Sequence, residues 1–368
     1  MPTGPTILFA GGGSGGHIFP SIAVAQRVSE LDSQAAIHFV VSNRSIDATI
    51  MSQHQYEWSP SPARPLPRTP LKVLGFYNAW KKARKQAGKI ILDEQVKAVL
   101  CAGGFVSGAV AVEARKKRIP VILLNLDATP GIANRWLSKR VDHVYTVYKQ
   151  EDWHHAEHIG LPLRRQAISP DDKAQARVDM GLDPTRRTLL VVGGSLSAKS
   201  INEMMLEMVH LASTQQVMRQ WQILHISGNE DAQRMELAYR KANIQAKVLS
   251  FTHEMGLAWR CASAAISRSG AGSVAEVWHN AVPTIFMPYP YHKDQHQVHN
   301  AQPLVDAGAA LLLTDHVDPV QNAHQIINPL TELMVNKVYR QNMVDWLTKT
   351  RPADGAEVIA RALLRHLR

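Results

Sequence analysis

The chain has 368 residues, of which 41 are Lys or Arg and 31 are Asp or Glu, so its formal net charge is +10. With 45% hydrophobic and 20% charged residues, the composition excludes disordered and fibrous proteins, and the length predicts two domains. No apolar run approaches the ~18 residues of a membrane span, and the first residues lack the pattern of a secretory signal peptide. The two cysteines, Cys101 and Cys261, are too few for a disulfide framework or a Cys-based zinc site, which is typical of a reducing cytosol.

Short apolar runs alternate with helical patterns along the chain. The first run, residues 6–10, ends in glycines and precedes a helical apolar pattern over residues 22–28. Further strands are predicted at residues 37–41, 98–102, 121–124 and 144–147, and then at 188–192, 222–226, 247–251, 264–266, 284–287 and 310–313. Continuous apolar strands separated by helices are typical of parallel sheets covered by helices on both faces.

A polar, proline-containing stretch over residues 160–172 divides these strands into two series of similar length. The sequence therefore predicts an α/β protein with two doubly wound domains, residues 1–162 and 163–347. The amphipathic segment 348–368 can dock back on the first domain. Because a doubly wound sheet binds ligands beyond the carboxyl ends of its strands, we expect the two domains to face a cleft.

Positive charge is concentrated in the first half of the chain. Residues 1–165 contain 21 basic and 12 acidic residues, and no acidic residue occurs between Glu57 and Asp93. Aromatic and aliphatic residues are interleaved with the basic residues of that stretch. The pattern indicates a surface for an anionic membrane or nucleic acid, or else a solvated helix whose apolar face packs inward.

Three glycine-rich segments follow predicted strands, at residues 11–16, 103–104 and 193–194. Glycines allow close backbone approach, and the free N–H groups of a following helix attract anions. The first segment fits the dinucleotide pattern GxGxxG, but no acidic residue follows the second strand. The third segment comes close to a nucleotide-binding P-loop, but Ala198 replaces its second glycine. A diphosphate ligand is therefore favoured over a nicotinamide cofactor or an NTPase activity.

Three histidines, His292, His296 and His299, would share one helix face at i, i+4 and i+7. A metal site is the weaker interpretation, because no acidic residue completes an HExxH motif and two prolines precede the segment. Polar contacts with a ligand are favoured.

Taken together, five segments resemble the MurG family. They are AGGGSGGHIFP at 10–20, GGFVSG at 103–108, GGS at 193–195, SRSGA at 267–271 leading to Glu276, and the segment from His292 to Ala301. Enzymes of this family move N-acetylglucosamine from UDP-GlcNAc to undecaprenyl-diphospho-muramoyl-pentapeptide. The resemblance implies a GT-B fold, two Rossmann-like domains with the donor in the cleft, and a transferase of peptidoglycan biosynthesis that serves cell-wall biogenesis, cell shape and cell division.

The resemblance also implies roles for individual residues on the donor side. Glu276 would grip the ribose hydroxyls, His296 and Gln297 would read the sugar hydroxyls, and backbone groups at Thr252 would meet uracil. Four further residues match positions at the donor or its diphosphate: Ser14, Gly15, Arg164 and Ser195.

On the acceptor side, His17 matches the histidine proposed as base, with Asp127 as a second candidate. Glycines and one amide would form the acceptor and phosphate loops: Gly12, Gly13, Gly16, Gly103, Gly104 and Asn134. The sequence departs from the family pattern here, since Leu124-Asn125-Leu126-Asp127 stands where His-Glu-Gln-Asn is usual.

Within the basic stretch, one group of residues resembles the membrane-association patch of the family: Leu74, Phe76, Tyr77, Trp80, Lys81 and Lys82. The resemblance implies a peripheral protein on the cytoplasmic face of the bacterial inner membrane, whose partners are a UDP-sugar, a polyprenyl-diphosphate-linked acceptor and anionic lipid, with no nucleic acid.

The resulting prediction is an inverting glycosyltransferase that needs no metal and no cofactor. Two alternatives stay open at the sequence level. One is a related GT-B transferase with the same donor and another acceptor, and the other is a non-catalytic nucleotide-sugar-binding protein that associates with membranes.

Overall fold

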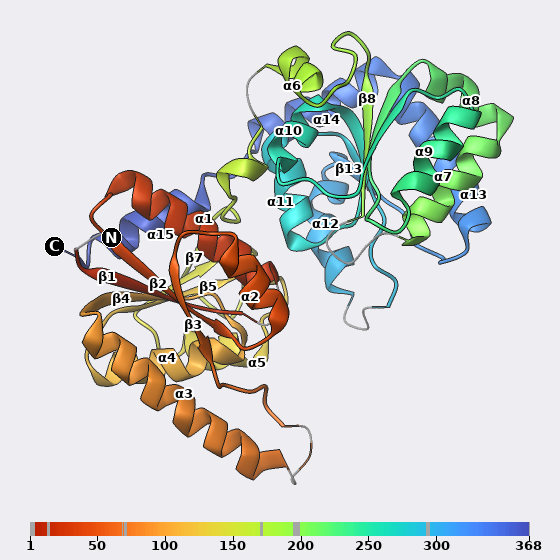
Figure 1. Cartoon of the computed structure of the whole chain (residues 1–368). Helices are drawn as coiled ribbons and strands as arrows, with labels where there is room; N and C mark the ends of the chain where they lie inside the picture. Colours follow the sequence, from red (N-terminus) through yellow and green to blue (C-terminus); the bar gives the residue numbers. More distant parts are fainter. Residues whose placement is uncertain are drawn as a thin grey trace. The chain divides into compact units, whose positions relative to one another are not determined.

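The apolar runs of the sequence form the strands of two separate parallel sheets, each between layers of helices (Figure 1). The computed structural model describes residues 4–12, 15–67, 69, 72–169, 172–193, 199–291 and 295–367. Residues 1–164 and 353–368 form one compact unit, called unit 1, and residues 165–352 form the other, called unit 2. The predicted α/β class with two Rossmann-like units is confirmed.

Within the described residues, the sheet of unit 1 has seven strands in the order β3-β2-β1-β4-β5-β6-β7, and neighbouring strands are parallel. Its strands are β1 (Thr6–Ala10), β2 (Ala36–Ser42), β3 (Glu57–Ser61), β4 (Val96–Cys101), β5 (Val121–Asn125), β6 (His143–Thr146) and β7 (Ala156–His158). Its helices are α1 (Gly15–Leu31), α2 (Ser45–Ser52), α3 (Val73–Asp93), α4 (Gly104–Lys116), α5 (Ile132–Ser138) and α15 (Gly355–Leu364).

The central strand β1 shows why the runs are continuously apolar. Ile7 and Phe9 pack into the core on the side of α1 and α15, while Leu8 and Ala10 pack into the core on the side of α3 and α4. All four residues are fully buried. A strand covered on both faces has no solvent side, so hydrophobic and polar residues do not alternate along it.

Two edge strands, β3 and β7, were not predicted. β3 has the sequence EWSPS and is only partly buried, and β7 is three residues long with Glu157 and His158 exposed. Proline at position 60 is tolerated because an edge strand does not need every N–H for its neighbours. Edge strands therefore lack the apolar signal of the central strands.

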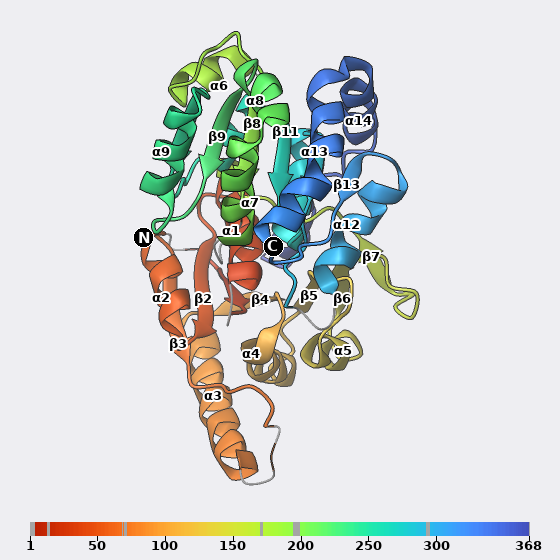
Figure 2. The same ribbon diagram turned by 90° about the vertical axis from the view of Figure 1, so that its right-hand side faces the viewer.

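The basic stretch of the sequence includes the long helix α3. This helix packs on α4, and its buried residues are mostly small: Ala79, Ala83, Ala87 and Ile91. One end of α3 extends beyond the strands in both views (Figures 1 and 2). Among the residues that the structure describes, no helix is both long enough and apolar enough to cross a bilayer.

In its described residues, unit 2 contains a second parallel sheet with the strand order β10-β9-β8-β11-β12-β13. Its strands are β8 (Thr188–Val192), β9 (Gln222–Ile226), β10 (Ala246–Leu249), β11 (Ala262–Ser267), β12 (Thr284–Phe286) and β13 (Ala310–Leu312). Its helices are α6 (Lys173–Asp179), α7 (Lys199–His210), α8 (Ala212–Arg219), α9 (Ala232–Lys241), α10 (Met255–Cys261), α11 (Ala271–Asn280), α12 (His296–Asp306), α13 (Pro319–Val335) and α14 (Lys337–Lys349).

Helix α15 returns the chain to unit 1 and packs on α1. The guanidinium of Arg27 in α1, whose side chain is 1% exposed, donates from Nε to Asp354 Oδ2 at 2.8 Å. Its Nη2 donates to the carbonyl of Leu163 at 3.4 Å. Asp354 also caps α15 by accepting from the N–H groups of Ala356 and Glu357. One buried arginine therefore binds both places where the chain passes between the units.

Replacing Asp354 should destabilise unit 1. Arg27 has a second, more distant carboxylate partner, Glu30 Oε1 at 3.6 Å from Nη1. Asp354→Ala removes the closer partner of this buried charge and the cap of α15, which should lower the free energy of unfolding by about 3 kcal/mol. Asp354→Asn keeps a capping oxygen and isolates the ion pair, with an expected loss of about 2 kcal/mol. Urea unfolding measures both values.

The control is Asp318→Ala, which removes the cap of α13 on Gln321 N and should cost about 1 kcal/mol. An Asp354→Asn variant as stable as the parent would show that the ion pair does not stabilise the fold.

Candidate functional site

The glycine-rich segments of unit 1 meet at the carboxyl edge of its sheet. β1 and β4 are paired neighbours, and Ala10 lies opposite Cys101, so the segments that follow them are adjacent. Ser107 Oγ, in α4, is 2.9 Å from the carbonyl oxygen of Ala10 and 2.6 Å from that of Gly103. Gly104 has φ +76°, and a Cβ there would lie 2.8 Å from the carbonyl oxygen of Gly12. A side chain at this position would separate the two segments.

His17, in the first turn of α1, connects the segment after β1 with the segment after β4. Its Nδ1 lies 2.8 Å from the carbonyl oxygen of Ala102. Because a carbonyl oxygen only accepts, Nδ1 carries the proton in this contact, and Nε2 of the neutral ring keeps its lone pair. The residue is half-buried, and the hydrogen bond to Ala102 orients its imidazole. A role for this imidazole as base stays a prediction.

Amide side chains continue the same edge toward β5. Asn134 Nδ2 donates to Asn125 Oδ1 at 2.9 Å, and Asn125 Nδ2 donates to the backbone oxygen of Asp127 at 2.8 Å. Both asparagines are buried, whereas Asp127 is only half-buried. A Cβ on Gly103 would lie 2.8 Å from Asn134 Oδ1, so the glycine segment and this amide pair fit together closely.

In unit 2, Glu276 lies in α11 and is held by a buried indole. Trp259 Nε1 donates to Glu276 Oε2 at 2.8 Å, and Trp259 is 1% exposed. At the start of α11, Cβ atoms added to Gly270 and Gly272 would meet nothing within 4 Å. The carboxylate is thus oriented on a helix whose first turn borders open space.

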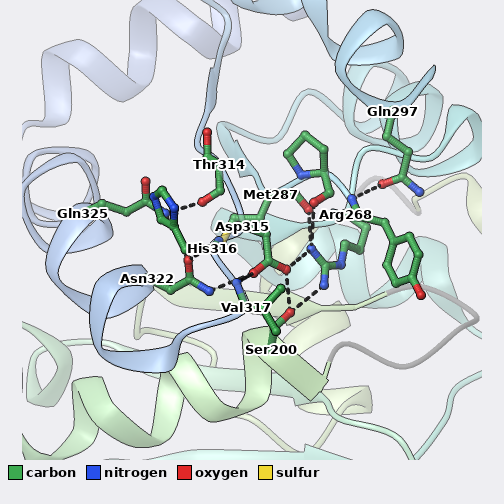
Figure 3. A network of polar contacts seen from close by, with 12 residues as sticks. Ser200, Arg268, Met287, Gln297, Thr314, Asp315, His316, Val317, Asn322 and Gln325 are labelled. Atoms are coloured by element: carbon green, nitrogen blue, oxygen red, sulfur yellow. Dashed lines mark hydrogen bonds and ion pairs between the residues drawn. The ribbon is translucent and has the colours of Figure 1, made fainter. Parts of the chain in front are cut away.

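The other donor-side residues that the structure describes also follow strands of unit 2. Gln297, in α12, accepts from the backbone N–H of Tyr289 at 2.8 Å (Figure 3), and His296 begins that helix. Thr252 follows β10, and its hydroxyl accepts from the N–H of Glu254 at 3.0 Å. Asn300 ties α12 to the segment after β11 through the carbonyl of Ser269 at 3.3 Å.

Arg164 belongs to unit 1, whereas Glu276, Thr252 and Gln297 belong to unit 2. Its guanidinium lies 4.1 Å from the ring centroid of Phe19 in α1. Its contact with a donor diphosphate stays a prediction. Gly13, Ser14, Ser195 and His292 lie outside the described residues, and the structure gives no side-chain surroundings for Gly15.

Sequence reasoning missed a polar network at the carboxyl edge of unit 2 (Figure 3). Arg268 Nη1 and Asp315 Oδ2 are 2.7 Å apart, and their side chains are 6% and 0% exposed. Burial alone would raise the pKa of Asp315, but hydrogen bonds from Ser200, Asn322, the N–H of Val317 and Arg268 outweigh it and hold the pKa below its usual range. The only sequence signal for Asp315 is its place shortly after a predicted strand.

The residues of the predicted membrane patch lie on α3 and are exposed to different degrees. Leu74, Tyr77, Lys81 and Lys82 are exposed. Trp80 is half-buried, and its ring lies 3.1 Å from where a Cβ on Gly108 of α4 would be. The Trp80 ring therefore packs on α4 with part of its surface. The role of Trp80 in the membrane patch stays a prediction.

Comparisons with known proteins show to which family the chain is similar. The model of the glycosyltransferase family 28 N-terminal domain matches residues 7–146, and that of the C-terminal domain matches residues 188–359. A UDP-N-acetylglucosamine–N-acetylmuramyl-(pentapeptide) pyrophosphoryl-undecaprenol N-acetylglucosamine transferase from Halothermothrix orenii is 29% identical and covers 89% of this chain and 90% of its own. The enzyme of the same name from Nocardioides sp. is 31% identical and covers 84% of both chains.

The crystal structure of MurG from Acinetobacter baumannii superposes with a TM-score of 0.75 at 23% identity, covering 98% of this chain and 99% of that one. This likeness supports the GT-B fold. Since both halves of family 28 are matched and a 31% identical relative spans most of the chain, the protein belongs to the MurG family of glycosyltransferases.

Proposed function

We propose that the protein transfers N-acetylglucosamine from UDP-GlcNAc to the muramoyl 4-hydroxyl of undecaprenyl-diphospho-muramoyl-pentapeptide, the conversion of lipid I to lipid II in peptidoglycan synthesis. Relatives that span most of the chain bear the name of this activity. The observation that carries the proposal is the carboxylate of Glu276, the residue that the sequence resemblance assigns to the ribose, which Trp259 orients beside the open start of α11.

On the donor side, a carboxylate is the acceptor that paired ribose hydroxyls favour, because hydrogen bonds to a charged acceptor are the stronger ones. Gln297 has one amide oxygen engaged with Tyr289 N, and its NH₂ group can donate to sugar hydroxyls. As the sugar leaves, negative charge gathers on the UDP diphosphate. The start of α7 and Arg164 would stabilise this charge, and we propose that no divalent cation is needed.

On the acceptor side, the hydroxyl attacks the anomeric carbon from the face opposite UDP, so the configuration inverts. A base must take the hydroxyl proton. His17 fits this role because its Nδ1 donates to Ala102 O, which leaves Nε2 able to accept. Asp127, half-buried after β5, is the second candidate.

Removing the carboxylate of Glu276 should weaken UDP binding. Glu276→Ala should cost about 1–3 kcal/mol of binding free energy, and Glu276→Gln, which can still accept from Trp259, isolates the loss of charge. Calorimetry with UDP measures both, with Glu236→Ala on the exposed face of α9 as the control. Unchanged affinity in both Glu276 variants would remove this residue from the site.

Turnover distinguishes the two bases. His17→Ala should lower kcat by about 10²–10⁴ with UDP affinity retained, and His17→Asn, which can still donate to Ala102 O, should behave alike. If Asp127 is the base, Asp127→Asn should show the larger loss. UDP release is assayed with and without a lipid-linked muramoyl acceptor, and in EDTA, where we expect activity to persist.

Wild-type kcat in the His17 and Asp127 variants would mean that neither residue is the base. A rate of UDP release that is the same with and without the muramoyl acceptor would contradict the proposed reaction. Activity that is lost in EDTA and restored by Mg²⁺ would contradict the metal-free mechanism.

We further propose that α3 docks on the cytoplasmic face of the bacterial inner membrane, where the lipid-linked acceptor would be found. Helix α3 carries the exposed apolar side chains Leu74 and Tyr77 and the exposed cations Lys81 and Lys82. The ammonium of Lys81 lies 6.0 Å from the Tyr77 ring centroid. Apolar residues flanked by cations suit the interface of an anionic leaflet.

Reversing the charge of Lys81 and Lys82 should weaken sedimentation with anionic vesicles, because each surface cation contributes about 1 kcal/mol near such a leaflet. UDP affinity should not change. The matched control reverses two exposed lysines of unit 2, Lys337 and Lys349. Tyr77→Ala should reduce the binding that survives high salt. If the Lys81/Lys82 variant sediments like the parent, α3 is a solvated helix face.

A further inference from the structure

The strongest unassigned feature is the buried network around Asp315, which connects three loops at the carboxyl edge of unit 2 (Figure 3). Arg268 follows β11 and Asp315 follows β13, and the strand between them is β12. Arg268 Nη1 donates to Asp315 Oδ2. It also donates to the backbone oxygens of two residues that follow β12, Met287 at 2.8 Å and Pro288 at 3.1 Å. The ends of three neighbouring strands are thus joined through one guanidinium.

The same carboxylate also holds the beginning of α7. Ser200, in the first turn of that helix, donates from Oγ to Asp315 Oδ2 at 2.6 Å and accepts from Arg268 Nη2 at 2.7 Å. Asp315 Oδ1 is held separately, by Asn322 Nδ2 at 2.9 Å and by the N–H of Val317 at 2.8 Å. With both oxygens bound by donors, the carboxylate has little freedom to rotate.

Two polar atoms beside this network have no internal partner. Among the residues that the structure describes, Arg268 Nε and the hydroxyl of Ser269 are buried and form no hydrogen bond, and Ser269 is 0% exposed. Leaving such groups unpaired costs stability. Both residues lie in the loop between β11 and α11, the helix that carries Glu276. Because their cost in stability has no structural return within the described residues, we infer that this loop is kept in a fixed shape for ligand binding.

We propose that Asp315, acting through Ser200 and Arg268, is a positioning residue that fixes the start of α7 and the segment before α11 in the shape that binds the UDP diphosphate. The inference rests on the proposed function, since the diphosphate is assigned to the start of α7. Asp315 itself need not touch the substrate. It sets the positions of groups that do.

UDP binding by calorimetry, together with urea unfolding, tests the proposal. Asp315→Asn keeps the shape and loses the charge opposite Arg268, and it should weaken UDP binding about tenfold or more. Ser200→Ala leaves the Arg268–Asp315 pair intact but releases α7, and it should also weaken UDP binding. Ser200→Thr restores the hydroxyl and should bring affinity back toward that of the parent. In turnover assays, the Asp315 and Ser200 variants should raise KM for the donor more than they lower kcat.

The matched control is Arg340→Lys. Arg340 is another buried arginine of unit 2, bound to the backbone oxygens of Leu333 and Met334, and it should affect unfolding but not UDP affinity. If Asp315→Asn and Ser200→Ala lose stability as Arg340→Lys does but bind UDP like the parent, the network serves only the fold and the proposal is wrong. Failure of the parent protein to bind UDP would instead contradict the proposed function. If Asp315→Asn does not fold, Ser200→Ala with its threonine rescue decides the question alone.

Discussion

Parallel strand pairing is the constraint on which the rest of this molecule depends. Each strand of a parallel sheet must be followed by a crossover that returns the chain to the same end of the sheet. The carboxyl ends of all strands, and the loops that follow them, therefore lie at one edge. In unit 1 this edge holds Gly12, Gly103 and the ring of His17. In unit 2 it holds Arg268 and Asp315, which are 47 residues apart in sequence. Polar chemistry is concentrated there because both faces of each sheet are filled by apolar packing.

The central strands could be predicted because burial on both faces leaves a continuous apolar run, as in residues 188–192 of β8, where every residue is buried. The edge strands could not. Within the part of the chain that the structure describes, β3 and β7 each pair with one strand and are only partly buried, so burial imposes no apolar pattern on them. Their residues, including Glu57 and His158, read as loop positions until the neighbouring strand is known.

The same limit applies to side chains. The glycine segments and Glu276 stand in local motifs, so their sequence neighbours predict them. Ser200 and Asp315 bind across 115 residues, and Arg27 and Asp354 across 327. In the sequence alone, an arginine near the end of a helix and an aspartate after a strand both resemble solvated surface residues. Only the order of the strands, and the return of the chain to unit 1, shows that these charges are buried and paired.

The return of α15 to unit 1 has a consequence for how the chain is made. Unit 2 is continuous in sequence, whereas unit 1 is interrupted by it. Ile359, Ala360 and Leu363 of α15 are fully buried in the core that contains α1. As the polypeptide emerges from the ribosome, unit 2 can therefore complete its core before the last helix of unit 1 has been synthesised. Until then, α1 presents an uncovered apolar face, and the nascent first half is the part of this protein that a chaperone would have to shield.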